Sequence, residues 1–415
     1  MTDVERPGVA ARRDDNRRLS LYRLLDPAVL ADPYPLYQRL RDEAPVYWDP
    51  FLHAWIVTRY DDVVRVLTHF SATCAPSPEQ LAAHGMETLA PVAEVLVRQM
   101  LFLDAPAHTR VRRLAAKAFT PRRVELLRGH ITEIVERLLD DVQERGSMDV
   151  VADLARPLPA IVSAEMLGLP PEHWPQLTVW SRAFAEILGN FQHDPASAAR
   201  VLRSVEEMTT YLRQAIRDQA ETPRDGLLRA LMLAEVDGDR FTEEEVIANT
   251  IITMVGGQET TTNLIGNGIL SLLRRPDEWE RLKADPSLVP SAVEELLRYE
   301  SPSQHTARLA PEDTELGGNV IRKREGVIAV LGAANRDPEQ FAAPDKLDLG
   351  RADNRHVAFG WAAHYCFGAS LARIEGQQAF ASLARRMGDM RLTSEPLTWR
   401  SNLGLRGLDA LPVEL

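Results

Sequence analysis

The stretch His356-Val-Ala-Phe-Gly-Trp-Ala-Ala-His-Tyr-Cys-Phe-Gly368 presents a cysteine, Cys366, directly before a segment with helical periodicity. Apolar side chains at Leu371 and Ile374 predict a helix that begins near Ala369. A cysteine ahead of a helix N-terminus faces unpaired N–H groups and the positive end of the helix dipole, which both favour the thiolate. The sequence therefore predicts that Cys366 is a metal ligand or a nucleophile.

The chain has two cysteines, Cys74 and Cys366, which excludes a zinc or iron–sulfur site with four thiolate ligands. Residues 359–368 resemble the haem-ligand loop of the cytochrome P450 family, Phe-Gly-x-Gly-x-His/Arg-x-Cys-x-Gly. Ala362 departs from this pattern, because the family usually has a second, more flexible glycine there. A buried structural cysteine at a helix start is the alternative. Gly360 falls on the same pattern. The resemblance implies that Cys366 is the iron ligand and assigns to haem binding Phe359, His364, Cys366 and Gly368.

Length and composition favour one large globular unit. The chain has 415 residues, of which 45% are apolar, and a formal net charge of -12 that argues against nucleic acid as a partner. It shows neither an N-terminal apolar segment nor a long uncharged apolar run. We therefore expect a cytoplasmic monomer without membrane contact, with one domain over residues 1–415 and a flexible N-terminal segment over residues 1–25.

The first elements are predicted from turn residues and periodicity. Prolines at residues 33 and 35 favour a helix entry, and Leu36, Tyr37 and Leu40 supply its apolar face. Residues 46–48 and 54–58 read as a hairpin, and a further helix begins at residue 60. Amphipathic helices then fill residues 124–239, with breaks at residues 168–171 and 193–195.

Residues 104–113, Asp-Ala-Pro-Ala-His-Thr-Arg-Val-Arg-Arg, place His108 and Arg112 four apart on one helix face. The run resembles the P450 pattern Asp-x-Pro-x-His-x-x-x-Arg, which supplies cations to the haem propionates. The resemblance gives this role to His108 and Arg112, and likewise to Arg308 and His364. An ordinary solvated basic face is the alternative.

The same region is basic, although the chain as a whole is acidic. No acid occurs among the basic residues Arg110, Arg112, Arg113, Lys117, Arg122 and Arg123. Such a cluster can steer an acidic partner by long-range attraction. We expect its outward members to form the docking patch for an acidic ferredoxin.

The longest predicted helix starts at a capping box, Thr242-Glu-Glu-Glu245, and runs to residue 275, where Pro276 ends it. Its middle, Gly256-Gly-Gln-Glu-Thr-Thr-Thr262, breaks the rules for a buried helix, because each glycine costs about 1 kcal/mol and the carboxylate is desolvated. The run resembles the P450 oxygen-activation motif. The resemblance implies that Gly256 allows close approach to a ligand and that Glu259 and Thr260 relay protons; a helix kinked for packing is the alternative.

Ser291-Ala-Val-Glu294 predicts another capping box, and the helix behind it carries Glu295 and Arg298 on one face. The pair resembles the buried Glu-x-x-Arg ion pair of the P450 family, which is joined by a later arginine and supports the cysteine loop. Strand-like segments follow at residues 306–309, 318–321 and 326–331. Residues 402–408 resemble the last P450 hairpin. The resemblance makes three residues candidate substrate contacts: Gln304, His305 and Leu403.

Four motifs occur in family order over residues 26–415: the Asp-x-Pro-x-His-x-x-x-Arg run, the oxygen-activation motif, the Glu-x-x-Arg pair and the cysteine loop. They imply the P450 fold, which is mainly α with a small β lobe, and haem b between the Glu259 helix and the Cys366 loop. The implied activity is a haem-thiolate monooxygenase of natural-product biosynthesis, which uses dioxygen to hydroxylate, epoxidise or oxidatively couple a small hydrophobic substrate. Its two electrons would come from a separate ferredoxin and ferredoxin reductase, because no reductase domain follows the last hairpin.

Three other classes of function compete with this interpretation. A cysteine acyl-transfer enzyme could use Cys366 with His364 as its base, but it leaves residues 256–262 unexplained. A thiolate-haem isomerase or dehydratase would have less need of Glu259 and Thr260. A haem-binding sensor would explain the cysteine loop, but it would not explain the proton relay at Glu259 and Thr260.

Overall fold

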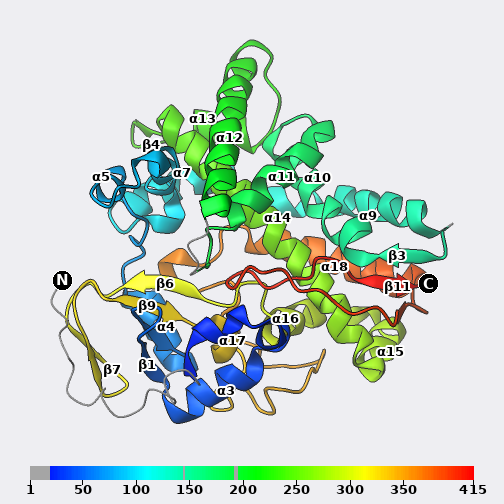
Figure 1. The fold of residues 1–415 in the computed structure, drawn as a ribbon. Helices are drawn as coiled ribbons and strands as arrows, with labels where there is room; N and C mark the ends of the chain where they lie inside the picture. The colour runs from blue at the N-terminus through cyan, green and yellow to red at the C-terminus, as the bar shows by residue number, and fades with distance from the viewer. Residues whose placement is uncertain (1–18, 144, 191–194) are drawn as a thin grey trace.

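The computed structural model describes residues 19–143, 145–190 and 195–415. It is mainly helical with small sheets, which confirms the predicted fold class (Figure 1). The α-helices are α2 (Pro27–Ala31), α3 (Tyr34–Glu43), α4 (Tyr60–His69), α5 (Pro78–Ala82), α6 (Ala90–Leu96), α7 (Ala107–Ala118), α8 (Pro121–Glu125), α9 (Arg128–Gln143), α10 (Pro157–Leu167), α11 (Trp174–Ala185), α12 (Pro195–Glu221), α13 (Leu227–Leu233), α14 (Glu243–Leu273), α15 (Pro276–Ala284), α16 (Val289–Tyr299), α17 (Leu331–Ala334) and α18 (Ala369–Arg386).

The main sheet joins the predicted hairpin to later strands in the order β1-β2-β9-β6. β1 and β2 pair antiparallel, while β2 and β9 run parallel. The predicted helix around Tyr37 and the helix from Tyr60 are confirmed as α3 and α4. Two-stranded or three-stranded sheets form elsewhere. The strands are β1 (Val46–Asp49), β2 (Ala54–Val57), β3 (Ser147–Asp149), β4 (Glu235–Val236), β5 (Asp239–Arg240), β6 (Thr306–Leu309), β7 (Thr314–Leu316), β8 (Asn319–Ile321), β9 (Gly326–Ala329), β10 (Arg391–Leu392) and β11 (Pro412–Glu414).

The expected flexible segment, residues 1–25, is wrong for residues 19–25. Leu21 and Leu24 are fully buried in a short 3₁₀ helix, η1 (Leu21–Leu25). The Ser20 hydroxyl donates to Asp49 Oδ2 at 2.7 Å, which ties this segment to β1. Burial of the two leucine side chains offsets the loss of conformational entropy when the segment becomes ordered. Residues 1–18 lie outside the described residues, as do residues 193 and 194 of the second predicted break.

α14 runs through the middle of the molecule, with α18 and α16 packed beside it and α12 above (Figure 1). Both halves of the predicted capping box are present at Thr242 and Glu245. Its 31 residues give a length of about 46 Å. One core cluster lies around its C-terminal half and another around its N-terminal half, so this helix determines where the functional motifs meet.

The predicted capping box at Ser291 is wrong. α16 begins at Val289, and the Ser291 hydroxyl donates to the carbonyl of Leu288 at 3.0 Å instead of capping the helix. Pro290 is tolerated in the first turn because the N–H it lacks would have no partner there. The helix therefore starts earlier than the serine indicates.

No helix within residues 19–143, 145–190 and 195–415 is both long and apolar enough to traverse a bilayer.

Candidate active site

The cysteine loop folds back on itself just before α18. The Cys366 N–H donates to the Phe359 carbonyl at 2.8 Å, and α18 begins at Ala369 as predicted. Burial raises the pKa of the Cys366 thiol, while the N–H of Gly368 and the Arg112 charge oppose this rise. The helix N-terminus therefore does not by itself produce the predicted thiolate; binding to a metal ion would deprotonate the thiol.

Ala362 keeps a glycine-like backbone in this loop. Its φ is 53°, and Gly360 two residues earlier has a φ of 71°. A left-handed conformation costs an L-residue about 1–2 kcal/mol because Cβ crowds the carbonyl oxygen. The loop thus adopts the turn expected from the family pattern in spite of the missing glycine, and Ala362 stores strain.

Ala362→Gly is expected to raise the free energy of unfolding by up to roughly 1 kcal/mol. The relieved strain of about 1–2 kcal/mol exceeds the extra unfolded-state entropy of glycine, about 0.4–1 kcal/mol. Urea denaturation measures the effect. Ala363→Gly is the matched control: Ala363 is also exposed but has no left-handed backbone, so this change should only lower stability. Equal losses from both changes would contradict the assignment of strain to Ala362.

The middle of α14 leaves space beside Gly256. A Cβ built on Gly256 would meet no atom within 4 Å, and the Thr260 hydroxyl donates to the Gly256 carbonyl at 2.6 Å. The helix continues unbroken through both glycines. The partly exposed residues of this otherwise buried region are Ile252, Thr253, Gly256, Gly257 and Thr260.

The Glu259 side chain contacts an arginine from the C-terminal part of the chain. Its side chain is 5% exposed and forms an ion pair with Arg400, which lies just before the predicted last hairpin. A buried carboxylate requires a partner, so the sequence indicated that some cation must be near. It did not indicate which of the chain's arginines, because Arg400 is 141 residues away.

The four predicted propionate cations gather beside the cysteine loop. The rings of His108 and His364 lie 4.2 Å apart between centroids, and Arg112 Nη2 donates to the Tyr365 carbonyl at 2.7 Å. Burial and then the neighbouring charges of His108 and Arg308 lower the pKa of His364 to about 4. Burial also lowers the pKa of His108 and that of Arg308.

These residues fit a haem group. His108 Nε2 and Arg308 Nε are buried without a protein partner among the described residues, although buried polar atoms are normally paired. A propionate would satisfy both and favour the charged forms of the cluster. The space beside Gly256 lets a ligand approach the helix backbone, and a soft sulfur at Cys366 suits an iron ion.

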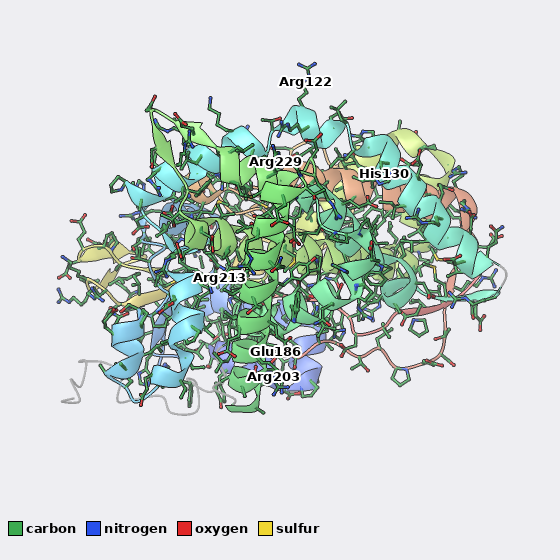
Figure 2. The ribbon with its side chains drawn as sticks, turned by 90° about the horizontal axis from the view of Figure 1, so that it is seen from above. Arg122, His130, Glu186, Arg203, Arg213 and Arg229 are labelled. Atoms are coloured by element: carbon green, nitrogen blue, oxygen red, sulfur yellow. The ribbon has the colours of Figure 1, made fainter. Side chains whose placement is uncertain are left out.

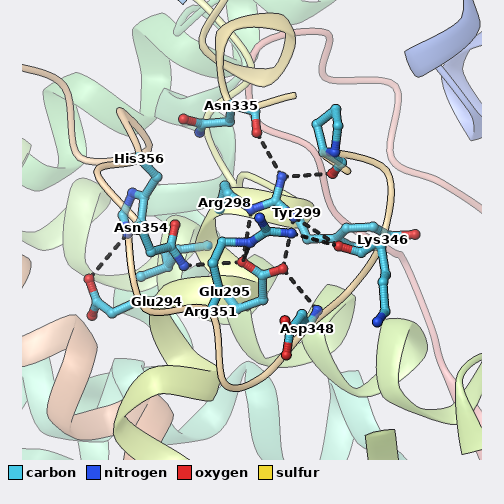
Figure 3. A network of polar contacts seen from close by, with 12 residues as sticks. Glu294, Glu295, Arg298, Tyr299, Asn335, Lys346, Asp348, Arg351, Asn354 and His356 are labelled. Carbon is cyan, nitrogen blue, oxygen red and sulfur yellow. Dashed lines mark hydrogen bonds and ion pairs between the residues drawn. The ribbon is translucent and has the colours of Figure 1, made fainter. Parts of the chain in front are cut away.

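The Glu-x-x-Arg pair is a fully buried network, shown in Figure 3. Arg298 donates to both oxygens of Glu295 at 2.8 Å, and Arg351 Nε donates to the same carboxylate at 3.0 Å. Asn354 and the N–H of Asp348 also donate to it. Arg351 is the later arginine that the family resemblance implied, and the network holds the chain that leads into the cysteine loop.

A second carboxylate braces the loop from the same helix. Glu294 accepts two hydrogen bonds from Arg373, at 2.7 and 2.8 Å. It also contacts His356 Nε2 at 3.2 Å, as Figure 3 shows. The Arg373 guanidinium lies 4.6 Å from the Phe359 ring centroid. Although burial acts in the opposite direction, these cations lower the pKa of Glu294 to about 2. Sequence reasoning missed this contact because Glu294 was interpreted as a helix cap.

The candidate substrate contacts lie around residues 402–408. The Gln304 N–H donates to the Gly404 carbonyl at 2.8 Å, and its side-chain amide donates to Ser301. Burial lowers the pKa of His305 to about 4, and a backbone hydrogen bond with Leu403 opposes this shift. All three residues are buried. The structure thus brings Gln304, His305 and Leu403 together, and their contact with substrate stays a prediction.

The basic cluster is partly neutralised in the fold. Arg110 forms ion pairs with Asp239 at 2.7 Å and Glu245 at 2.6 Å, and Arg113 lies 3.2 Å from Asp237. The stretch of sequence around these arginines lacks acids, but the folded surface does not, because the β4–β5 hairpin supplies Asp237 and Asp239 and α14 supplies Glu245. Lys117, Arg122 and Arg123 remain exposed, and Figure 2 shows Arg122 pointing away from the molecule.

Together, the helical fold, the cysteine loop, the cation cluster and the open face of α14 define a haem protein with a cysteine beside its cofactor site. Comparisons with known proteins agree. The cytochrome P450 family model matches residues 49–387, and the chain belongs to this family. Its members bind haem b through this fold, and the protein is a P450 monooxygenase, an oxidoreductase.

The relatives come from several biosynthetic systems. The polyketide biosynthesis cytochrome P450 PksS of Bacillus subtilis (strain 168) is 37% identical over 399 residues, which cover 92% of this chain and 96% of PksS. The 6-deoxyerythronolide B hydroxylase of Saccharopolyspora erythraea is 35% identical over 397 residues, covering 92% and 96%. The crystal structure of P450BioI with a hexadec-9Z-enoic acid ligated acyl carrier protein superposes with a TM-score of 0.88 at 36% identity, covering 94% and 99%.

Proposed function

We propose that this P450 hydroxylates a small hydrophobic organic substrate in natural-product biosynthesis, as a single catalytic domain. The observation that carries the proposal is the joint presence of a cysteine loop and of a buried carboxylate, Glu259, next to a partly exposed hydroxyl, Thr260, on one helix. An isomerase or a sensor has less need of this pair. The relatives named for polyketide biosynthesis and for a hydroxylase support the substrate class.

Each predicted site residue has a proposed task. Cys366 holds the iron, and four cations bind the propionates: His108, Arg112, Arg308 and His364. Bound haem supplies the oxidising chemistry, with dioxygen, two electrons and two protons converting a C–H bond to an alcohol and releasing water. The Thr260 hydroxyl passes protons toward the open space at Gly256, and Glu259 supplies them. Gln304, His305 and Leu403 are the proposed substrate contacts.

The electrons are proposed to come from a separate acidic ferredoxin and its reductase, docked at the exposed basic residues near α8. Lys117→Glu is expected to weaken productive ferredoxin binding several-fold and to reduce the salt dependence of electron transfer. Arg113→Glu should have a smaller effect, because Asp237 already offsets that charge. The measurement is the rate of haem reduction against ionic strength. Unchanged rates and salt dependence in both variants would rule out this docking surface.

The substrate class is tested by optical titration of the ferric protein with macrolide, terpenoid, fatty-acid and aromatic scaffolds. A Soret shift toward high spin is expected for the class that enters the site, because the ligand displaces water from the iron. A haem band that no scaffold moves would contradict a free small-molecule substrate and favour a carrier-bound one. Absence of any haem band after reconstitution would overturn the proposed function itself.

A further inference from the structure

The C-terminal loop, residues 402–408, joins two parts of the hydrophobic core. Leu403 packs in the cluster that contains Leu21 of η1, whereas Leu405 packs in the cluster around the N-terminal half of α14. This second cluster includes Val255, which lies in the middle of α14. Figure 1 shows the C-terminal chain, in red, beside the N-terminal helices, in blue. The loop thus reaches from the N-terminal part of the chain to the helix that lines the haem space.

Backbone hydrogen bonds place this loop beside the segment that carries the candidate substrate contacts. Leu405 forms a bridge with Ser303, and the Arg406 N–H donates to the Pro302 carbonyl at 2.8 Å. The Arg406 carbonyl accepts a hydrogen bond from Asn267 Nδ2 of α14 at 2.9 Å. The Arg406 backbone is therefore bound both to α14 and to the chain that leads into β6.

The Arg406 side chain binds the N-terminal segment, residues 19–31. It is buried and donates to the carbonyl of Leu30 and, at 2.9 Å, to the carbonyl of Ala31. These two residues end α2, and carbonyls in the last turn of a helix have no partner within that helix. The planar fork of N–H groups lets one guanidinium satisfy both carbonyls. Arg406 thus connects two segments that lie more than 370 residues apart in the sequence.

A buried acid and an aromatic ring hold the guanidinium in place. Glu300, which caps the C-terminus of α16, forms an ion pair with Arg406, and the Arg406 guanidinium lies 3.6 Å from the Trp399 ring centroid. Arg336 uses the same acid, at 3.8 Å, and its guanidinium lies 3.3 Å from the Tyr34 ring centroid. Cation–π contacts of this kind are strongest where water is excluded. The two arginines therefore share one desolvated site and differ in the chain segments that they hold.

Resting on the proposed function, we infer that Arg406 is a positioning residue for the C-terminal loop, and that through it the N-terminal segment fixes one wall of the substrate site. The loop is short, so its position depends on contacts outside itself. At its start, the Asn402 side-chain amide donates to the Ala185 carbonyl of α11 at 2.7 Å. At its end, Arg406 binds α2 and α16. The wall between these two ends is therefore only as rigid as both attachments.

Hydrogen exchange of the full-length protein, measured by mass spectrometry, tests the link between the two segments. Arg406→Lys keeps the positive charge, but an ammonium group lacks the planar fork that binds the two α2 carbonyls. Exchange should become at least about tenfold faster both in residues 19–31 and in residues 402–408, because both lose the same attachment. Exchange in α9 should stay within about twofold of the parent. Faster exchange in residues 402–408 alone, or equally faster exchange throughout the chain, would overturn the inference.

Azole binding tests the consequence for the substrate site. A ring nitrogen of an azole binds ferric haem iron and shifts the Soret band, so affinities can be measured before a substrate is known. Arg406→Lys should weaken clotrimazole, an imidazole with a bulky triaryl group that reaches the walls, at least about fivefold, because the wall is no longer preorganised. Imidazole itself should stay within about twofold, because it needs no wall.

Trp399→Leu is a second variant, which removes the ring beside the Arg406 guanidinium and keeps every charge. It should weaken clotrimazole about twofold and accelerate exchange in the same two segments as Arg406→Lys. This variant decides the question if Arg406→Lys does not fold. Unchanged clotrimazole affinity in every variant that folds would overturn the inference.

Arg336→Lys is the matched control. Arg336 is buried beside Glu300 and the Tyr34 ring, like Arg406, but its Nη2 donates to the Tyr299 carbonyl of α16 at 2.7 Å. This variant should lower the urea midpoint, as Arg406→Lys does, and leave clotrimazole affinity within about twofold of the parent. An equal loss of affinity in both variants would reduce Arg406 to a structural residue. A parent protein without an azole shift would refute the proposed function, whereas hydrogen exchange would still decide whether Arg406 links the two segments.

Discussion

Cys366→Ser is expected to reduce product formation to background. The serine hydroxyl is a neutral ligand and cannot donate electron density to iron as a thiolate does, so cleavage of the O–O bond loses its driving force. The protein should still fold, because serine is nearly isosteric and the Cys366 N–H bond to Phe359 is unaffected. The measurement is the Soret band of the ferrous carbon monoxide complex together with product yield.

Cys74→Ser is the matched control for this change. Cys74 is the only other cysteine, it is partly buried, and its sulfur lies 4.0 Å from the Ala307 carbonyl, away from any helix start. This variant should keep the parent's carbon monoxide spectrum. If Cys74→Ser loses the thiolate band and Cys366→Ser keeps it, the ligand assignment is wrong.

Glu295→Gln is expected to cost about 3–5 kcal/mol of unfolding free energy. The change leaves the fully buried Arg298 guanidinium without a counter-charge and also weakens the contact with Arg351. Such a loss is a large part of the total stability of a typical domain, about 5–15 kcal/mol. We expect a lower urea midpoint and faster loss of haem from the loosened cysteine loop.

Glu43→Gln provides the comparison at an exposed ion pair. Glu43 pairs with Arg39 at 3.1 Å, and their side chains are 53% and 34% exposed. The expected cost is below about 0.5 kcal/mol, because water already solvates both charges. Equal midpoints for the two variants would show that the network around Glu295 does not support the fold.

The two capping-box patterns in the sequence had opposite outcomes in the structure. The capping box at Thr242 formed as predicted, whereas the one at Ser291 did not, because a preceding proline let α16 begin earlier. Glu294 was thus free to pair with Arg373 and brace the cysteine loop. Local patterns predict that a helix exists more reliably than they predict its first residue.

The sequence by itself determined the parts of this protein that depend on local spacing. The cysteine before a helix, the Glu–Thr pair in a long helix and the order of the four motifs predicted the family, the cofactor and the fold class. Each of these features can be recognised from neighbouring residues or from chain order. Helix periodicity fixes which neighbouring side chains share a face.

Only the tertiary structure decided which distant groups meet. It paired Glu259 with Arg400, joined Arg351 to Glu295, neutralised Arg113 with Asp237 and gave Ala362 a left-handed backbone. A buried charge must find a partner, but many arginines satisfy that requirement equally in the sequence. The choice among them depends on packing over separations of 56 and 141 residues, which no local pattern encodes.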